Sequence, residues 1–268
     1  MINITSFVLY SAFFLIRLRK IQMGIKFTIA NIIFFSIILS LGIINLYFDI
    51  SIFFHILVAV SYSGFIFFMS SNVCSQFFIK TICKLNNSKG NIFITFDDGI
   101  NSVTTPQIIN ILEKYGVKAT FFVIGNRVEE NLDIAKKLVN SGHLLGNHTL
   151  SHSNLFGIYR TKKVVDEIFS TNKIIEEITG QKVTLFRPPF GVTNPNIAKA
   201  VRKTEMKCVG WSIRSLDTVK SKKQILERVK EVKSGDIILF HDTKKHTVEI
   251  LDEFLHYCKG KGLKPELF

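Results

Sequence analysis

Residues 92–99 read IFITFDDG: five apolar or β-branched residues, then two carboxylates and a glycine. The apolar run predicts a buried strand, Asn91 to Asp97, and Gly99 permits a sharp turn where the strand ends. Neighbouring side chains on an extended segment point to opposite sides, so Asp97 and Asp98 are suited to different roles. Asp-Asp-Gly is also an ordinary turn sequence, so the motif alone leaves a structural and a catalytic role equally open.

Further along the chain, short β-branched or aromatic runs alternate with amphipathic stretches. This alternation predicts an α/β fold, with a parallel sheet or barrel covered by helices. The expected strands are Asn91 to Asp97, Lys118 to Gly125, His143 to Thr149, Leu185 to Phe190, Cys208 to Arg214 and Asp236 to His241. The expected helices are Thr105 to Tyr115, Glu129 to Ser141, Lys162 to Thr179, Pro195 to Lys203, Lys222 to Lys233 and Val248 to Lys259.

Two long apolar runs precede this region. Phe27 to Phe48 carries no formal charge, and Ser51 to Ile79 carries only the titratable His55. Each run is longer than the ~20 apolar residues that span a bilayer as a helix. Buried core helices are the alternative, but such runs without a polar face leave a soluble protein nothing to expose to water. We therefore expect a membrane region with a transmembrane helical hairpin in residues 1–85 and a separate domain in residues 86–268.

Positive charges flank the two long runs. A third apolar stretch, Ile2 to Ile16, is shorter than a comfortable span and is either a short first helix or an interfacial segment. Because positive residues tend to stay on the cytoplasmic side, the flanks predict a hairpin with both ends inside and the domain on the cytoplasmic face. One misassigned span would place the domain on the external face instead. The flanking charges are Arg17, Arg19, Lys20 and Lys26 before the first run, and Lys80, Lys84 and Lys89 after the second.

The chain is basic, with a formal net charge of +13, and residues 1–84 contribute only six Lys or Arg and one Asp. A basic domain beside a bilayer suggests membrane lipid headgroups or phosphate-bearing ligands as partners. No basic helix interleaved with aromatic residues supports nucleic acid as a partner. The four cysteines lack Cys-x-x-Cys spacing, so we expect free thiols rather than a disulfide framework or a zinc cluster. They are Cys74, Cys83, Cys208 and Cys258.

Polar side chains follow the ends of the expected strands, the rim where barrels assemble their chemistry. His148-Thr149-Leu150-Ser151-His152 separates two imidazoles by four residues, and on one helical turn both would lie on one face. Two imidazoles and a carboxylate suit a metal site with an open position. A lone pair of loop histidines is more often structural, so the metal interpretation depends on the other motifs. The polar residues at the rim are Asp97, Asp98, His148, His152, Arg187, Asp217, His241 and Asp242.

Two further motifs end strands. Arg187-Pro188-Pro189-Phe190-Gly191 is rigid because the prolines fix φ and remove two backbone donors, so the Phe190 N–H can be aimed at one point. A stiff turn that closes the barrel is the alternative. Leu239-Phe240-His241-Asp242 ends the last strand with a histidine, which is suited to protonating a departing amine near neutral pH.

In this order, the four motifs resemble the polysaccharide deacetylase family, also called the NodB-like domain or carbohydrate esterase family 4. The resemblance covers roughly Ile92 to His256, nearly all of the soluble part. It implies a distorted (β/α) barrel that holds one divalent metal ion, usually zinc. The implied ligands are Asp98, His148 and His152.

The same resemblance implies roles at the other matching positions. Asp97 would be the general base, oriented by Arg187, and His241 would be the general acid. The Phe190 backbone N–H would contribute to the oxyanion hole, and Pro189 would border the substrate beside it.

The chain departs from the family pattern at residues 214–218, which read Arg-Ser-Leu-Asp-Thr where the family often has Asp-x-x-Asp-Trp. Asp217 keeps the carboxylate that would pair with the general acid. Thr218 in place of tryptophan removes an apolar wall of the groove, and Arg214 adds a positive charge at the rim. Trp211 would replace part of the lost substrate-binding surface, with a buried core position as the alternative. These changes argue against an ordinary polymeric substrate.

The implied reaction is hydrolysis of the N-acetyl amide of an amino sugar in a polysaccharide or glycan. The expected hairpin and the basic domain favour a second substrate, a lipid-linked amino sugar at the membrane surface. A catalytically silent carbohydrate-binding membrane protein is a third interpretation. All seven proposed catalytic and metal-binding side chains are present in the sequence, which favours an enzyme.

Overall fold

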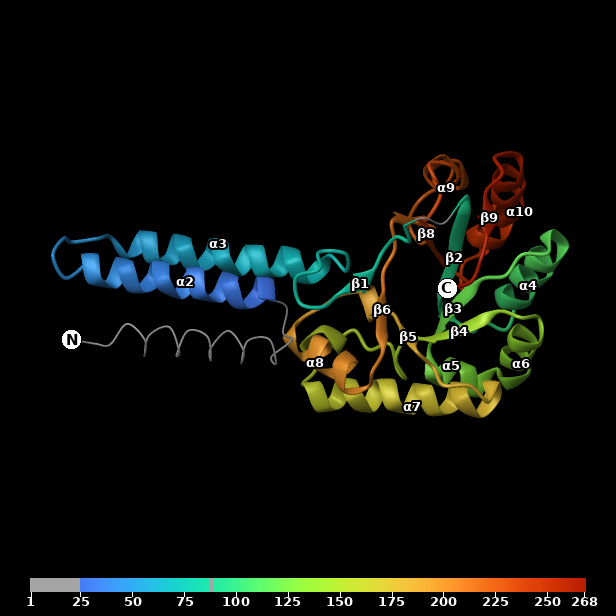
Figure 1. The fold of residues 1–268 in the computed structure, drawn as a ribbon, viewed down its shortest axis with the longest axis horizontal. Helices are drawn as coiled ribbons and strands as arrows, with labels where there is room; N and C mark the ends of the chain where they lie inside the picture. The colour runs from blue at the N-terminus through green and yellow to red at the C-terminus, as the bar shows by residue number, and fades with distance from the viewer. Residues whose placement is uncertain (1–24, 87–88) are drawn as a thin grey trace.

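A helical hairpin projects from an α/β domain in this computed structural model, which describes residues 25–86 and 89–268 (Figure 1). The hairpin consists of α2 (Ile25–Ile44) and α3 (Ile52–Ser71). The stretch Ile2 to Ile16, expected to be a first helix or an interfacial segment, lies outside the described residues.

The second long apolar run is helical over a shorter range than expected, because α3 ends at Ser71 rather than near Ile79. Asn72 leaves the helical conformation, with φ −110° and ψ 99°, and its side-chain oxygen accepts a hydrogen bond from Cys74 N at 3.0 Å. The chain then turns back onto the domain, where Phe77 and Phe78 are buried.

The domain is built on a parallel sheet, so the expected α/β class is confirmed. The strands run in the order β1-β6-β5-β4-β3-β2-β8-β7, and β9 pairs with β2. All the strand pairs are parallel. The strands are β1 (Thr81–Ile82), β2 (Asn91–Gly99), β3 (Thr120–Val123), β4 (Leu144–Asn147), β5 (Leu185–Phe186), β6 (Lys207–Val209), β7 (Ile213–Arg214), β8 (Ile237–His241) and β9 (Lys264–Pro265).

Helices follow most strands and surround the curved sheet (Figure 1). They are α4 (Thr104–Tyr115), α5 (Gly125–Glu130), α6 (Leu132–Asn140), α7 (Thr161–Thr179), α8 (Pro195–Lys203), α9 (Lys222–Val229) and α10 (Lys245–Gly260), with short 3-10 turns at Phe156–Ile158 and Pro189–Gly191. Between the sheet and these helices lies one large apolar core. Three rings from adjacent strands stack within it: the Phe96 ring lies 4.8 Å from that of Phe121 and 5.8 Å from that of Phe240.

Two expected elements are divided in the structure. The run from Cys208 to Arg214 forms β6 and β7, because residues 210–212 leave the strand conformation and the chain bends at Ser212. The run from Glu129 to Ser141 forms α5 and α6, because Asn131 leaves the helical conformation at φ −136°. The short strands β1 and β9 were not expected, and β1 extends the sheet upstream of the expected domain boundary at residue 86.

Cys74 and Cys83 form a disulfide that closes the segment between α3 and the sheet. The expectation of four free thiols is therefore wrong for this pair, whereas Cys208 and Cys258 are free and buried. The Cα atoms of the pair lie 6.0 Å apart because the segment after Ser71 doubles back. Sequence spacing alone does not reveal that reversal.

The base of the hairpin is packed onto the domain. Thr193 N donates to Ser70 O at 2.9 Å, and the Ser70 hydroxyl donates to Thr193 O at 2.7 Å. Phe77 and Phe78 pack with Ala198 of α8 in a small apolar cluster, which Phe27 of α2 also joins. The hairpin thus contacts the domain directly, immediately after the Pro189–Gly191 turn.

Candidate active site

The first strand motif ends in a β-bulge. Asp97 pairs with Phe122 and Gly99 with Val123, so Asp98 is an extra residue in β2, with φ 68°. A bulge redirects the side chain that it inserts. Asp98 Oδ1 lies 3.5 Å and Asp97 Oδ2 lies 3.8 Å from the same nitrogen, His148 Nε2. The expectation that the two carboxylates point to opposite sides of a regular strand is therefore wrong.

The two histidines of the second motif lie in a loop after β4, not on a helix as the four-residue spacing suggested. Thr149 and His152 both take a positive φ, 70° and 47°, and this folds the loop back on itself. The two imidazole rings are consequently 4.9 Å apart.

A buried glutamate that the sequence reasoning missed holds this loop. Glu167 Oε2 accepts hydrogen bonds from Leu150 N at 3.1 Å and Ser151 N at 2.9 Å, and the Ser151 hydroxyl also donates to its carboxylate. The signal was present, since Glu167 lies among the apolar positions Val164 and Ile168 on the buried face of α7. A carboxylate on such a face needs hydrogen-bond partners.

Asp98, His148 and His152 form a cluster whose donor atoms all lie within 4.8 Å of one another. Asp98 Oδ1 is 3.3 Å from His152 Nε2 and 3.5 Å from His148 Nε2. Ligands at 2.0–2.1 Å from a tetrahedral cation are separated by roughly 3.3 Å, so these spacings suit one small divalent ion.

The hydrogen bond of the His148 ring also fits metal binding. The ring Nδ1 lies 2.7 Å from Arg187 O, a carbonyl that can only accept, so Nδ1 carries the proton and donates it. In the tautomer that keeps this bond, the lone pair is on Nε2, which faces Asp98. Metal-binding histidines commonly bind a carbonyl through their second nitrogen in this way. The residues present therefore fit a divalent metal.

Arg187 is fully buried and fixes Asp97. Its Nη1 donates to Asp97 Oδ1 at 2.6 Å and to the Thr95 hydroxyl at 2.8 Å. Its other guanidinium nitrogens donate to Val209 O and to Gly210 O, so the whole side chain is held. Burial lowers the pKa of Arg187, an effect that the Asp97 charge opposes. Asp97 Oδ2 is left facing the histidine cluster.

His241 is paired with Asp217, as the sequence predicted. Its Nδ1 lies 2.7 Å from Asp217 Oδ1, and its backbone N–H and the Thr247 hydroxyl donate to Asp217 Oδ2. Burial alone would lower the pKa of His241, but the hydrogen bond and charge of Asp217 raise it above its ordinary value. Because β8 pairs with β2 in register, His241 lies opposite Asp97.

Of the three residues expected to border the substrate, only Phe190 is exposed beside the histidine cluster, and Trp211 packs partly against the core, as the alternative interpretation held. The Phe190 side chain is 52% exposed, and its ring lies 4.8 Å from that of His152. Pro189 is buried. Trp211 is half-buried and packs so closely on Gly191 that an added Cβ there would lie 2.6 Å from its ring. The guanidinium of exposed Arg214 lies 5.9 Å from the Trp211 ring.

Amide hydrolysis needs a group that deprotonates water, a group that protonates the departing amine, and electrophilic stabilisation of the oxyanion. The carboxyl ends of β2, β4 and β8 supply candidates for all three in one place. The fold and the site together define a hydrolase.

Comparison with known proteins specifies the hydrolase further. The family model described as polysaccharide deacetylase matches residues 84–209. The chain is 31% identical to the peptidoglycan-N-acetylmuramic acid deacetylase PdaA of Bacillus subtilis, over 66% of this chain and 69% of that protein. It is 34% identical to a peptidoglycan-N-acetylglucosamine deacetylase of Bacillus cereus, over 66% of this chain and 86% of that protein.

Among solved structures, a wild-type pseudoenzyme of the CE4 family from Bacillus anthracis is similar, with a TM-score of 0.65 and 31% identity. The match covers 69% of this chain and 66% of that one. The chain belongs to the polysaccharide deacetylase family. The family-model match ends before β7, so the placement of Asp217 and His241 rests on the geometry described above.

Proposed function

We propose that this protein removes the acetyl group from an N-acetylated amino sugar of peptidoglycan. The observation that carries the proposal is the single cluster in which Arg187-bound Asp97 lies beside Asp98, His148 and His152. Both relatives named above act on peptidoglycan amino sugars. They favour a polymeric substrate even though Arg214 and Thr218 depart from the family pattern, and they lend no support to the lipid-linked alternative.

We assign Asp98, His148 and His152 as the ligands of one divalent ion, with zinc favoured by the mixed nitrogen and oxygen donor set. When bound, such an ion supplies Lewis acidity that polarises the amide carbonyl and makes water more acidic.

The protein groups then divide the proton transfers. Asp97, held by Arg187, accepts a proton from the attacking water through Oδ2. The Phe190 backbone N–H donates to the oxygen that gains negative charge. His241, held by Asp217, delivers the proton from Nε2 to the nitrogen of the amino sugar as the C–N bond breaks. The products are acetate and a free amine.

The direct test is acetate release by the detergent-solubilised full-length protein supplied with zinc. We expect release from isolated peptidoglycan, with N-acetylglucosamine oligomers and a lipid-linked amino sugar as comparison substrates. Release from the lipid-linked substrate alone would overturn the peptidoglycan assignment. Sugar binding without acetate from any substrate would identify a silent carbohydrate-binding protein.

The Asp217–His241 pair predicts a change in pH dependence. Protonated His241 is the active acid. Because Asp217 raises its pKa, His241 stays protonated at higher pH than a free histidine side chain. Replacing Asp217 with Asn removes the negative charge and lowers that pKa. We expect the alkaline limb of kcat/KM to move toward lower pH, with a larger loss of activity at pH 8 than at pH 6. An unmoved limb in a folded Asp217→Asn protein would exclude His241 as the acid.

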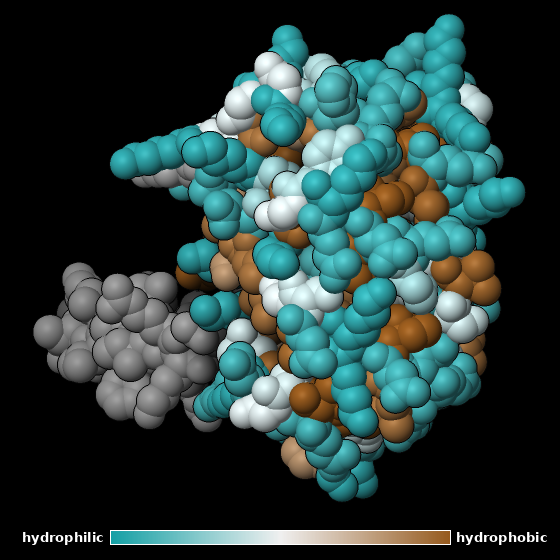
Figure 2. Space-filling view, turned by 90° about the vertical axis from the view of Figure 1, so that its right-hand side faces the viewer, coloured by the Kyte–Doolittle hydropathy of each residue, from teal (hydrophilic) through white to brown (hydrophobic). Residues whose placement is uncertain are grey.

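We further propose that the hairpin anchors the protein in a membrane. Both helices are 20 residues long and apolar enough to cross a bilayer, and none of their residues is buried. At 1.5 Å per residue, each spans about 30 Å, the thickness of the hydrocarbon core. The lack of burial argues against core helices of a soluble protein. By contrast, the face of the domain remote from the hairpin is predominantly hydrophilic (Figure 2).

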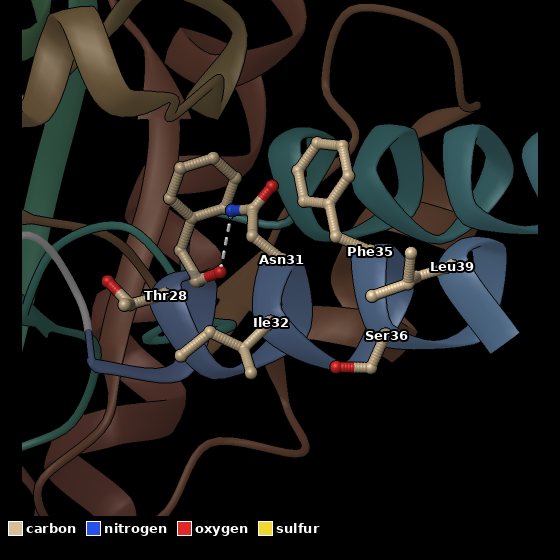
Figure 3. A pocket seen from close by; sticks show the side chains of 7 residues that line it. Thr28, Asn31, Ile32, Phe35, Ser36 and Leu39 are labelled. Carbon is tan, nitrogen blue, oxygen red and sulfur yellow. Dashed lines mark hydrogen bonds between the residues drawn. The ribbon is translucent and has the colours of Figure 1, made fainter.

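A groove runs along α2 and is lined by Phe27, Thr28, Asn31, Ile32, Phe35, Ser36 and Leu39. Its one amide side chain, that of Asn31, has hydrogen-bond partners within the hairpin. Asn31 lines this groove together with Phe35 (Figure 3). Its Nδ2 donates to Phe27 O at 2.8 Å, and its Oδ1 accepts from the Tyr62 hydroxyl of α3 at 2.8 Å. Polar groups in a bilayer need such internal partners. The groove is therefore compatible with a lipid environment.

The disulfide favours the external face for the domain, rather than the cytoplasmic face that the flanking charges predicted. Disulfides persist in oxidising surroundings and are rare in the cytosol. Cys74 follows α3 and Cys83 follows β1, so both lie on the same side of the membrane as the domain. Peptidoglycan would be accessible there. We expect a reporter that works only outside the cytoplasm to be active when it is fused after Phe268. Activity of a reporter that works only in the cytoplasm, fused at the same position, would exclude this orientation.

A further inference from the structure

Asp242 is a buried carboxylate beside the site, and the mechanism proposed above gives it no role. It follows His241 at the end of β8 and is 0% exposed. The Thr105 hydroxyl donates to its Oδ2 at 2.6 Å, whereas its buried Oδ1 has no partner among the described residues. Burial raises the pKa of Asp242 to about 7. A buried polar atom without a hydrogen-bond partner, such as Asp242 Oδ1, destabilises a fold, so we expect this carboxylate to have a compensating role.

The Asp242 carboxyl lies directly against the turn that carries the catalytic carboxylates. A Cβ added to Gly99 would lie 2.3 Å from Asp242 Oδ2 and 2.9 Å from its Oδ1. Only glycine permits an approach this close. In addition, Asp242 N donates to Asp97 O at 3.3 Å, so backbone and side chain both contact the turn.

Thr105 connects Asp242 to the far side of the same turn. Its hydroxyl accepts from Asn101 N at 2.9 Å while it donates to Asp242 Oδ2. The neighbouring Thr104 hydroxyl donates to Asp242 O. Asp242 thus links the end of β8, the first turn of α4, and both ends of residues 97–101.

The turn needs such support because Asp98 has φ 68°, a conformation that is uncommon for a residue other than glycine. Unusual backbone conformations persist when their surroundings over-determine them. Asp97 has a second anchor in Arg187. Asp98 is held through its backbone, where Arg127 Nη1 donates to its carbonyl, so a loosened turn would displace its carboxylate from the two histidines.

We propose that Asp242 is a positioning residue that holds the 97–101 turn so that Asp98 meets the two histidines of the cation site. The inference rests on the proposed function, in which Asp98 is a metal ligand. Its expected signature is a loss of metal affinity rather than a selective loss of base catalysis.

The test is the zinc dissociation constant of the full-length protein, measured by competition with a chromophoric chelator. Residues that support metal ligands typically contribute 10–100-fold to affinity, so Asp242→Ala should weaken zinc binding by at least about tenfold. Asp242→Asn keeps the shape and the acceptor for Thr105, and should bind within about threefold of wild type.

Asp236→Ala is the matched control. Asp236 is also a buried carboxylate, at the opposite end of β8, where it binds Lys84 and Ser212. It should reduce thermal stability with little change in zinc affinity. Equal losses of affinity in the Asp236 and Asp242 variants would reveal a general structural effect and overturn the inference.

A folded Asp242→Ala protein that binds zinc as tightly as the wild type would also overturn the inference. Should Asp242→Ala fail to fold, Thr105→Val removes only the hydroxyl that links Asp242 to the turn. We expect weaker zinc binding in this variant, and unchanged affinity would overturn the inference equally well. A wild-type protein that binds no zinc would instead overturn the metal assignment, and the inference with it.

Discussion

Asp97→Asn is expected to lower kcat by ~10²–10⁴-fold, the usual range for loss of a general base. Asn keeps the size of the side chain and an oxygen for Arg187, which bonds Asp97 Oδ1 at 2.6 Å. It cannot take a proton from water. Steady-state acetate release across a range of substrate concentrations should show the loss in kcat, with KM little changed.

The neighbouring carboxylate supplies the control for this variant. Asp98→Asn removes a negative metal ligand, so it should lower zinc content, whereas Asp97→Asn should retain wild-type zinc content. The two variants differ by one position in the chain and separate base catalysis from metal binding. Near-normal kcat in zinc-loaded Asp97→Asn would contradict the assignment of the base.

Metal removal is expected to have the second large effect. Chelation should reduce acetate release to the background rate, and stoichiometric zinc should restore it, because the proposed cation would supply Lewis acidity at the amide. Zinc should also raise the Tm, since a ligand that binds only the folded state stabilises it by mass action. A chelator-treated protein that contains no metal and keeps full activity would refute the metal-dependent proposal.

His148→Ala and His246→Ala provide a matched pair for this experiment. His148 is buried in the cluster, whereas His246 is an exposed histidine whose Nδ1 lies 3.1 Å from Glu249 Oε2. The first variant should lose both the zinc-dependent rise in Tm and the activity. The second should keep both.

The alternating pattern of the sequence predicted the main strands and helices because each apolar run is long enough to define a buried face. The motif of β2 predicted site residues well because β2 lies inside the sheet, where its end meets the ends of its neighbours. Its register with β8 brings Asp97 opposite His241, which lies far away in sequence. Short elements such as Thr81–Ile82 were missed because two residues carry no periodic signal.

The site residues were predicted more completely than their geometry. The spacing of His148 and His152 suggested a metal site, the family resemblance added Asp98, and the structure brings the donor atoms of all three together. How they meet depends on backbone conformations that spacing does not encode: the bulge at Asp98 and the positive φ of Thr149. The histidine loop, for example, is held by Glu167 from α7, a contact between segments that spacing within the motif does not show.

The cysteine prediction failed for a similar reason. Cys74 lies within an apolar run that resembles the continuation of a transmembrane helix, and a straight helix would carry it away from Cys83. The helix ends at Ser71 instead, and the two residues meet after a reversal. The local hydrophobic pattern was read correctly, but it does not determine where the helix stops.

The hydrogen bonds between Ser70 and Thr193 limit how far from the membrane the site can act. A catalytic domain on a long flexible tether could search the cell wall to a depth set by the length of the tether. Here the last turn of α3 is bonded to the loop that continues from Phe190 beside the site. With the hairpin in a bilayer, the site would be confined to a thin layer next to the membrane. Glycan strands would be deacetylated while they pass through that layer, and strands further out would escape the modification.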